Sequence, residues 1–147
     1  MSRKKVTVVG GGFVGSTTAQ RIVDMELADV VLTDILDGPP AGKALDMMES
    51  GPITRTDSRA TGISTATGDY SATAGSDVVV ITNPDKEYAA IDLASIPSST
   101  IVIDAWRLLR KQAGDRPNYV GLGLGDDNQR LSSALAGMWS NPARARA

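Results

Sequence analysis

The stretch Val6-Thr7-Val8-Val9-Gly10-Gly11-Gly12-Phe13-Val14-Gly15-Ser16-Thr17-Thr18-Ala19 decides the fold of this chain. A β-branched run ends in Gly10-x-Gly12-x-x-Gly15, and a helical pattern follows. In such a motif the first glycine allows a tight turn, the second lets a pyrophosphate approach the backbone, and the third lets the helix pack on the strand. The first N–H groups of a helix have no intrahelical partner, and the helix dipole favours an anion there. The N–H groups of Phe13 and Val14 are therefore candidate phosphate donors.

A second expected strand, residues 29–35, carries an acidic side chain near its end. Asp34 follows Gly12 by 22 residues, close to the ~20 expected for the acid that binds a ribose in this motif. A carboxylate there accepts hydrogen bonds from both ribose hydroxyls and repels a 2′-phosphate, which favours NAD over NADP. The alternative is a structural turn with an incidental acid. We predict dinucleotide binding.

Composition narrows the remaining classes of protein. The 147 residues favour one domain, and 41% apolar but only 4% aromatic residues indicate an aliphatic core. A net charge of −2 without a long basic run argues against nucleic-acid binding. The sequence has no cysteine, which excludes disulfides and thiolate sites, and no histidine, the commonest acid/base catalyst near neutral pH.

The amino-terminal residues 1–5 are basic, and the apolar run after them breaks at Gly10. That run is too short for a signal sequence or a membrane span. We expect a soluble, cytoplasmic protein with no membrane partner.

The rest of the chain alternates expected strands with helices or turns. Further strands are expected at 59–63, 78–82, 100–106 and 119–124, and helices at 13–26, 41–49, 108–112 and 129–139, with a loop or one helical turn at 69–75. Six strands in this order predict a single α/β domain with a doubly wound parallel sheet of order 3-2-1-4-5-6, the Rossmann architecture. We expect this domain to span residues 1–125, followed by a carboxyl-terminal helix and frayed tail at 126–147.

Helical spacing predicts which side chains pack inward. The expected inward residues are Val14, Ala19, Ile22 and Val23 in the first helix, Ala44, Leu45 and Met48 in the second, and Tyr88, Ile91, Leu93 and Ile96 in the crossover at 85–97.

In this architecture ligands bind at the carboxyl ends of the strands, where the strand order reverses. That rule places residues 10–15, Asp34, Thr82 and Asn83 around one crevice.

Residues 4–82 resemble the amino-terminal half of the lactate/malate dehydrogenase family, particularly the bacterial malate dehydrogenases. The resemblance lies in the glycine-rich stretch at 8–19 and in Val31-Leu32-Thr33-Asp34-Ile35, Gly42-Lys43-Ala44-Leu45-Asp46 and Ser76-Asp77-Val78-Val79-Val80-Ile81-Thr82. It implies NAD bound by Gly10, Gly12, Gly15 and Asp34, with Ile35 near the adenosine.

After Thr82 this resemblance stops. The family next places a mobile loop with substrate-binding arginines, and an Asp–His proton relay in a second domain. This chain has no histidine and only the short stretch 83–88 in place of the loop. The resemblance therefore implies an NAD(H)-binding domain without the usual relay, for which independent turnover of malate or lactate is not expected.

The back of the chain is similar to a different family. Residues 77–123, notably Ile101-Val102-Ile103-Asp104-Ala105-Trp106-Arg107 and Tyr119-Val120-Gly121-Leu122-Gly123, look like the carboxyl-terminal nucleotide-binding domain of UDP-glucose/GDP-mannose dehydrogenases. The catalytic cysteine of those enzymes, which lies in another domain, is absent here. This similarity keeps a UDP-nucleotide-binding module open as an alternative.

Other polar groups have a structural and a functional interpretation. Asp46 with Glu49, and Asp126 with Asp127, are carboxylate pairs that we interpret as solvated rather than metal-binding. Gly121-x-Gly123-x-Gly125 opens no evident helix, which favours a thin strand end over a second phosphate loop. We expect no metal, and no residue stands out as catalytic.

Four residues near the expected carboxyl edge remain as candidates. Lys86 and Arg107 are either surface charges or ligands for an anion. Asp104 is either a loop cap, which we favour, or an active-site acid. Trp106 either packs under the following loop, which we favour, or forms a stacking platform.

Three functions remain open. The chain is an NAD(H)-binding domain that serves a partner enzyme or a homodimer, a small NAD-dependent oxidoreductase that completes its site by oligomerisation, or a UDP-nucleotide-binding module.

Overall fold

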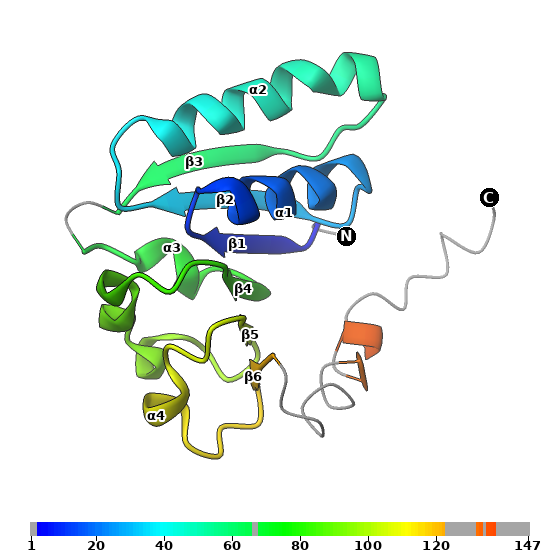
Figure 1. The fold of residues 1–147 in the computed structure, drawn as a ribbon. Coiled ribbons are helices and arrows are strands. Elements are labelled where there is room, and N and C mark those ends of the chain that lie inside the picture. The colour runs from blue at the N-terminus through cyan, green and yellow to red at the C-terminus, as the bar shows by residue number, and fades with distance from the viewer. Residues whose placement is uncertain (1–2, 66–67, 123–131, 134, 138–147) are drawn as a thin grey trace.

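One parallel sheet of six strands forms the centre of the protein. The structure, a computed structural model, describes residues 3–65, 68–122, 132–133 and 135–137. The strand order is β3-β2-β1-β4-β5-β6, as predicted. The strands are β1 (Lys5–Val9), β2 (Asp29–Asp34), β3 (Ala60–Ser64), β4 (Val78–Ile81), β5 (Ile101–Asp104) and β6 (Tyr119–Gly121). The order reverses between β1 and β4, so the first glycine turn leaves the middle of the sheet (Figure 1).

Helices cover both faces of this sheet. They are α1 (Phe13–Asp24), α2 (Pro39–Thr54), α3 (Ser71–Ala74) and α4 (Arg110–Ala113), with two 3-10 helices, η1 (Lys86–Ala90) and η2 (Leu93–Ser95). Helices α1 and α2 pack with β1, β2 and β3 (Figure 1), while η1, η2 and α4 contribute to a second apolar cluster. The predicted doubly wound architecture is confirmed.

Alternating side chains of β1 join these two clusters. Val6 and Val8 pack with Ala19 and Val23 of α1, whereas Val9 packs on the other face with Tyr88 of η1. Strand β1 pairs with β2 on one side and β4 on the other. A strand that is covered on both faces and both edges needs a continuous apolar run, which explains why residues 6–9 are β-branched throughout.

The buried side of α1 differs from the prediction. Ala19 and Val23 are buried as expected and Ile22 packs against them, but Val14 is exposed and Gly15 takes the buried position. The spacing of apolar residues predicted that Val14 belongs to the buried face. In the structure the helix lies so close to β1 that the residue facing the strand is Gly15.

Helix α2 is longer than predicted, and its inward face is also shifted. Its buried residues are Pro40, Ala44, Met47 and Gly51. The prediction was right for Ala44 and wrong for Leu45 and Met48, which are exposed. Because Met47 and Met48 are adjacent, hydrophobicity alone did not decide which of them faces the sheet; the buried residues Pro40, Ala44, Met47 and Gly51 recur at helical spacing.

The crossover after β4 folds as the sequence predicted. Tyr88, Ile91, Leu93 and Ile96 are all buried and join one core cluster with β4, β5 and β6. Asp85 and Asp92 accept hydrogen bonds from Glu87 N and Ala94 N at the starts of the two 3-10 helices. These short capped turns replace a full crossover helix.

The end of the chain is described in part. Residues 132–133 and 135–137, within the helix predicted at 129–139, are helical, and Leu135 packs against the cluster under α1. The rest of that helix and the predicted domain boundary at residues 125 and 126 lie outside the described residues. Among the helices that the structure describes, none is long and apolar enough to cross a membrane.

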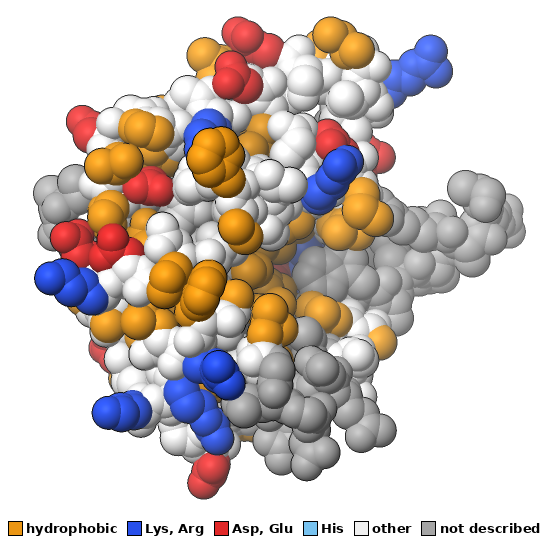
Figure 2. Space-filling view, in the orientation of Figure 1, with side chains coloured by type: hydrophobic (Ala, Val, Ile, Leu, Met, Phe, Trp, Pro, Cys, Tyr) orange, Lys and Arg blue, Asp and Glu red, His pale blue; other side chains and the backbone are white. Residues whose placement is uncertain are grey.

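The surface carries charges of both signs. In Figure 2 acidic side chains lie over α2 and Lys and Arg side chains lie near α4, with hydrophobic side chains spread between them.

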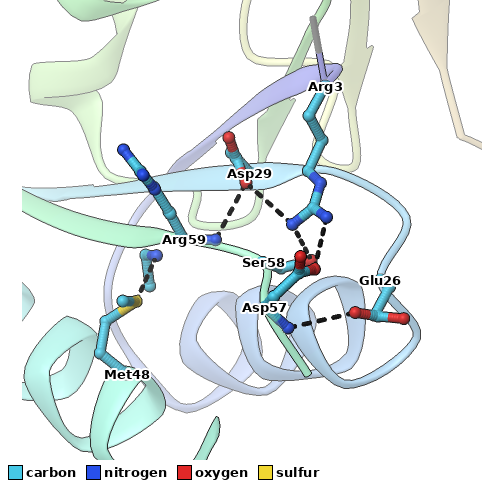
Figure 3. Close-up of polar contacts among 8 residues, drawn as sticks. Arg3, Glu26, Asp29, Met48, Asp57, Ser58 and Arg59 are labelled. Atoms are coloured by element: carbon cyan, nitrogen blue, oxygen red, sulfur yellow. Dashed lines mark hydrogen bonds and ion pairs between the residues drawn. The ribbon is translucent and has the colours of Figure 1, made fainter. Parts of the chain in front are cut away.

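Ionic contacts tie the amino ends of the strands together, at the edge opposite the glycine turn. Arg3 forms an ion pair with Asp57, lies 3.6 Å from an oxygen of Asp29 and donates to Ser58, while Glu26 accepts from Asp57 N (Figure 3). The hydrogen bond from Arg3 lowers the pKa of the Asp57 carboxyl. These contacts connect the chain before β1 with the ends of α1 and the entry to β3.

Asp77, which directly precedes β4, connects that strand to the start of β1. Its carboxylate accepts from Lys4 Nζ at 2.9 Å and from Lys5 N at 2.9 Å. Burial alone would raise the pKa of this carboxyl, but the hydrogen bonds from Lys5 N–H and the Lys4 ammonium outweigh burial and lower the pKa below its ordinary value.

We expect Asp77 to make stability depend on acid pH. A lowered folded-state pKa stabilises the protein above the unfolded pKa of about 3.9, and this contribution is lost as the pH falls further through the folded-state value. Asp77→Asn should lower the urea midpoint at pH 7 and flatten its decline below pH 4. Urea unfolding followed by circular dichroism from pH 7 to pH 2.5 measures both, with Asp46→Asn on the exposed side of α2 as control. An unchanged acid dependence in Asp77→Asn would contradict this role.

Candidate functional site

The glycine turn between β1 and α1 is shaped by two glycines that tolerate no side chain. Gly10 has φ of +99°, in the left-handed region. A Cβ on Gly15 would lie 1.6 Å from the carbonyl oxygen of Gly10. The two glycines therefore perform the tasks expected from the motif, a tight turn at Gly10 and close helix-to-strand packing at Gly15.

Gly12 has a different surrounding. It is the N-cap of α1, and a Cβ built on it would meet no described atom within 4 Å. The described residues therefore leave space at this glycine, on the side where a Cβ would point, and a ligand can approach the backbone there. The first intrahelical bond of α1 runs from Ser16 N to Gly12 O at 2.9 Å. The N–H groups that precede Ser16 in the helix have no carbonyl one turn earlier to bind, which suits them to an anion.

A cleft of about 240 Å³ opens beside this turn. It is lined by Gly10, Gly12, Phe13, Val14, Gly15, Thr82, Asn83, Pro84 and Trp106. The structure thus brings the glycine motif together with Thr82 and Asn83, as the strand order predicted. Pro84 is an additional wall residue that the sequence did not indicate, and Trp106, for which two interpretations were open, lines the cleft as well.

Thr82 and Asn83 differ in what their side chains do. Thr82 is buried, and its hydroxyl lies 2.9 Å from Val9 O and 3.1 Å from Gly10 O, so it fixes the end of β1 against β4. Asn83 is half-buried, and its side-chain oxygen accepts from Asp85 N at 3.1 Å. Thr82 is therefore a positioning residue of the turn, whereas Asn83 presents its side chain at the cleft.

Asp34 lies at the other end of the glycine turn, at the end of β2. Its Oδ2 accepts from Gly11 N at 2.5 Å and its Oδ1 accepts from Leu36 N at 3.0 Å. The residue is only 7% exposed. These two bonds fix the carboxylate against the backbone beside Gly12. A carboxylate has about four acceptor sites, so each oxygen keeps the capacity for a further hydrogen bond.

Ile35 and Tyr88 complete this end of the site. Ile35 is partly buried against the cluster that contains Tyr88 and Tyr70. The Tyr88 side chain is fully buried, and its hydroxyl makes no hydrogen bond of normal geometry within the described residues, although the Ile35 backbone lies near it. Burial, and then the negative charge of Asp34, raise the pKa of Tyr88 to about 12. The phenol is therefore neutral, and it lies in the core behind this end of the site.

Lys43 of α2 also contacts the turn, and we did not predict a role for it. Its Nζ donates to Gly11 O and to Ser16 Oγ, the latter at 2.9 Å. Ser16 Oγ in turn donates to Gly12 O. This lysine places a positive charge behind the start of α1. The signal in the sequence was the stretch Gly42-Lys43-Ala44-Leu45-Asp46, which is part of the resemblance to the dehydrogenase family. The resemblance alone gave no role to Lys43.

Asp104 caps the loop after β5, as the favoured interpretation had it. It is fully buried and accepts from Leu109 N at 2.8 Å, Tyr119 OH at 2.9 Å and Trp106 N at 3.1 Å. Trp106 does not pack under that loop as we had favoured. Its indole is 55% exposed, donates to Thr82 O at 3.0 Å and lines the cleft. The stacking-platform interpretation therefore fits its position better.

The other polar candidates stay away from the cleft. Lys86 and Arg107 are exposed and are not among its lining residues. Asp46 and Glu49 are exposed on α2. Within the part of the chain that the structure describes, no three acidic side chains gather as metal ligands would. Asp126, Asp127, Gly123 and Gly125 lie outside that part.

Comparison of the sequence with known families identifies the domain. A family described as lactate/malate dehydrogenase, NAD binding domain, matches residues 4–87, more than half of the chain. The chain belongs to the lactate/malate dehydrogenase family. Its match to the family is to the NAD-binding Rossmann domain, which is the part that carries the glycine turn and Asp34, and NAD is the cofactor of that domain.

Relatives within this family are malate dehydrogenases. The chain is 53% identical over 81 residues to a malate dehydrogenase of Roseiflexus sp. strain RS-1 and 55% identical over 83 residues to one of Bacillus subtilis strain 168. Each match covers 55% of this chain and 25% of the relative. The matched region is thus about a quarter of those relatives.

Solved structures of the family extend the likeness to the back of the sheet. The malate dehydrogenase of Picrophilus torridus matches with a TM-score of 0.69 and 27% identity over 95% of this chain and 51% of its own. A lactate dehydrogenase of Cryptosporidium parvum, solved with lactic acid and NAD, matches with a TM-score of 0.69 and 25% identity over 83% of this chain and 45% of its own. The described fold is thus that of about half of a lactate or malate dehydrogenase.

Asp104 gives a stability prediction. In Asp104→Ala two backbone N–H groups and the Tyr119 hydroxyl lose a buried charged acceptor, which should lower the free energy of unfolding by about 3 kcal/mol. Tyr119→Phe removes one of these bonds and should cost about 1 kcal/mol. Urea unfolding measures both variants, and a loss below about 0.5 kcal/mol in Asp104→Ala would contradict the capping role.

Proposed function

We propose that this chain binds NAD(H) across the carboxyl edge of the sheet, with the diphosphate at Gly10, Gly12 and Gly15. The N–H groups of Phe13 and Val14 are the donors to its oxygens. The observation that carries this proposal is the open space at Gly12, directly in front of the start of α1. An anion there gains from unpaired N–H groups and from the helix dipole, and the Lys43 ammonium behind the turn adds to the same field.

The adenosine half belongs at the end of β2. Asp34 is fixed by Gly11 N and Leu36 N and keeps acceptor capacity for the two ribose hydroxyls. A 2′-phosphate would meet this carboxylate in a largely buried setting, which disfavours NADP. Ile35 offers an apolar contact for the adenosine at the same end.

The other half of the cofactor reaches Thr82 and Asn83. The cleft residues there are glycines, apolar side chains, Thr82 and Asn83, and the sequence contains no histidine. None of these groups exchanges a proton readily near pH 7. We therefore propose a domain that binds the dinucleotide, with hydride transfer to a substrate depending on a homodimer or a partner enzyme. A cytoplasmic setting without nucleic-acid or membrane partners fits this role.

We expect Asp34 to decide the choice of cofactor. Asp34→Arg should weaken NADH binding at least tenfold, because two charge-assisted hydrogen bonds to the ribose are lost. The same substitution should reduce the difference in affinity between NADH and NADPH. Energy transfer from protein to nicotinamide during titration measures each affinity. Asp37→Arg, the same charge change at an exposed neighbouring position, is the matched control.

Gly12→Val tests the phosphate site separately. A Cβ at this position meets no described atom within 4 Å, so we expect the melting temperature to stay close to that of the wild type while NADH binding falls at least tenfold. The same titration with UDP tests the alternative that the chain is a UDP-nucleotide-binding module, which rests on the similarity of residues 77–123. Binding of UDP alone, or indifference of the folded chain to millimolar NADH, would overturn the proposal.

We expect no steady-state turnover of malate or lactate by the purified chain. The reason is that a hydride transfer from either substrate needs a proton acceptor on the hydroxyl, and the cleft residues offer none. NADH absorbance at 340 nm with each substrate and NAD⁺ measures the rate. Turnover that Gly12→Val abolishes would instead support the small oxidoreductase.

A further inference from the structure

The backbone of Gly11 is bonded at both of its polar atoms by side chains from other segments. Its N–H donates to Asp34 Oδ2 at the end of β2, at 2.5 Å, and its carbonyl accepts from the Lys43 ammonium of α2. Gly11 itself is buried, and charge-assisted hydrogen bonds in such a setting are strong. The middle of the glycine turn is therefore held between a carboxylate on one side and an ammonium on the other.

The charge of Lys43 is not neutralised by a carboxylate of the described residues. Its Nζ donates to Gly11 O and, at 2.9 Å, to Ser16 Oγ, whereas Lys4 at the opposite edge of the sheet forms an ion pair with Asp77. Asp46 lines the same groove as Lys43 but is exposed and forms no ion pair with it. Lys43 is half-buried, and a partly buried charge without a charged partner favours an anion nearby.

Lys43 does not line the cleft at Gly12. Together with Ser16 it lines a groove of about 370 Å³ between α1 and α2, whereas neither residue is among those that line the cleft. Lys43 therefore lies on the other side of the glycine turn from the space that opens at Gly12. An effect of this lysine on a ligand in the cleft has to pass through the backbone of the turn.

The peptide between Gly11 and Gly12 provides that connection. In a trans peptide the carbonyl and the N–H point in opposite directions. Because Lys43 bonds the carbonyl from the side of α2, the N–H of Gly12 points away from α2. Within the described residues this N–H has no hydrogen-bond partner, and Gly12 lines the cleft. Ser16 Oγ, which accepts from Lys43, donates to Gly12 O and so fixes the next carbonyl as well.

We propose that Lys43 is a positioning residue that turns the Gly11–Gly12 peptide so that the Gly12 N–H donates to the diphosphate, in addition to the N–H groups of Phe13 and Val14. The inference rests on the proposed function and deepens it. A side chain of α2 that does not touch the cofactor sets the affinity for its diphosphate, while Asp34 selects the ribose.

Calorimetric titration of the full chain with NAD⁺ and ADP-ribose tests this inference. Lys43→Met should weaken both affinities about 10-fold, the effect of one charge-assisted hydrogen bond, and Lys43→Arg, which keeps a charged donor, should recover most of the loss. Ser16→Ala, which loosens the ammonium without removing it, should show a smaller loss. Arg21→Met is the matched control, because it removes the same charge from an exposed side chain of the same groove. In about 1 M KCl, where charges are screened beyond about 3 Å, the loss in Lys43→Met should persist.

The amide proton of Gly12 gives a second and more direct measurement. In nuclear magnetic resonance spectra of the ¹⁵N-labelled wild type, saturation with ADP-ribose should move this proton downfield, because it gains a charged acceptor. In Lys43→Met at saturation the shift of Gly12 should be largely lost while those of Phe13 and Val14 remain. A loss of affinity caused by general damage to the turn would change all three shifts together.

The outcomes separate this inference from the proposed function. Binding of ADP-ribose by Lys43→Met within twofold of the wild type, or a Gly12 proton that does not move in the wild type, would overturn the positioning role and leave dinucleotide binding intact. A loss that Arg21→Met reproduces, or that 1 M KCl abolishes, would show that charge alone acts and would also overturn it. A wild-type chain that binds neither NAD⁺ nor ADP-ribose would overturn the proposed function, and the inference with it. Circular dichroism of each variant checks that the fold is retained.

Discussion

The contact between Gly15 and the carbonyl of Gly10 fixes the geometry of the whole carboxyl edge. With 1.6 Å between a Cβ at Gly15 and that oxygen, only glycine lets α1 begin so close to the end of β1. The start of α1 then points into the gap where the strand order reverses. The unpaired N–H groups of its first turn face this gap because the turn is so tight, and every proposed contact with the cofactor depends on this placement.

Around that contact, polar groups hold the turn before any ligand arrives. Asp34 bonds Gly11 N, Thr82 bonds the carbonyls of Val9 and Gly10, and Lys43 bonds Gly11 O. These groups come from β2, α2 and the end of β4, so three separate segments of the chain converge on three consecutive backbone residues, Val9, Gly10 and Gly11. A site that is fixed in this way loses little conformational freedom on binding, which leaves more of the interaction energy for affinity.

The two ends of the site differ in character, and this difference follows from how each is built. At the end of β2 the Asp34 carboxylate and the Lys43 ammonium both contact the glycine turn, which suits a sugar and a phosphate. At the ends of β4 and β5 the cleft lining is uncharged and contains Phe13 and Trp106. Asp104, whose carboxylate accepts from the Trp106 backbone, also accepts from Leu109 N and the Tyr119 hydroxyl. The uncharged lining of this cleft is the feature from which we propose that the domain holds the cofactor and depends on another surface for the chemistry of a substrate.

The sequence by itself determined the strand order, the parallel sheet, the roles of Gly10 and Gly15, and the inward residues of the crossover after β4. These features follow from local rules, since β-branched runs, glycine spacing and apolar periodicity each act over a few residues. Tertiary structure alone decided that Met47 rather than Met48 faces the sheet and that Lys43 reaches the glycine turn, and it decided between the two interpretations of Trp106. Each of these outcomes depends on the position of a segment that is distant in the sequence. Local rules cannot predict that position, because they act over only a few neighbouring residues.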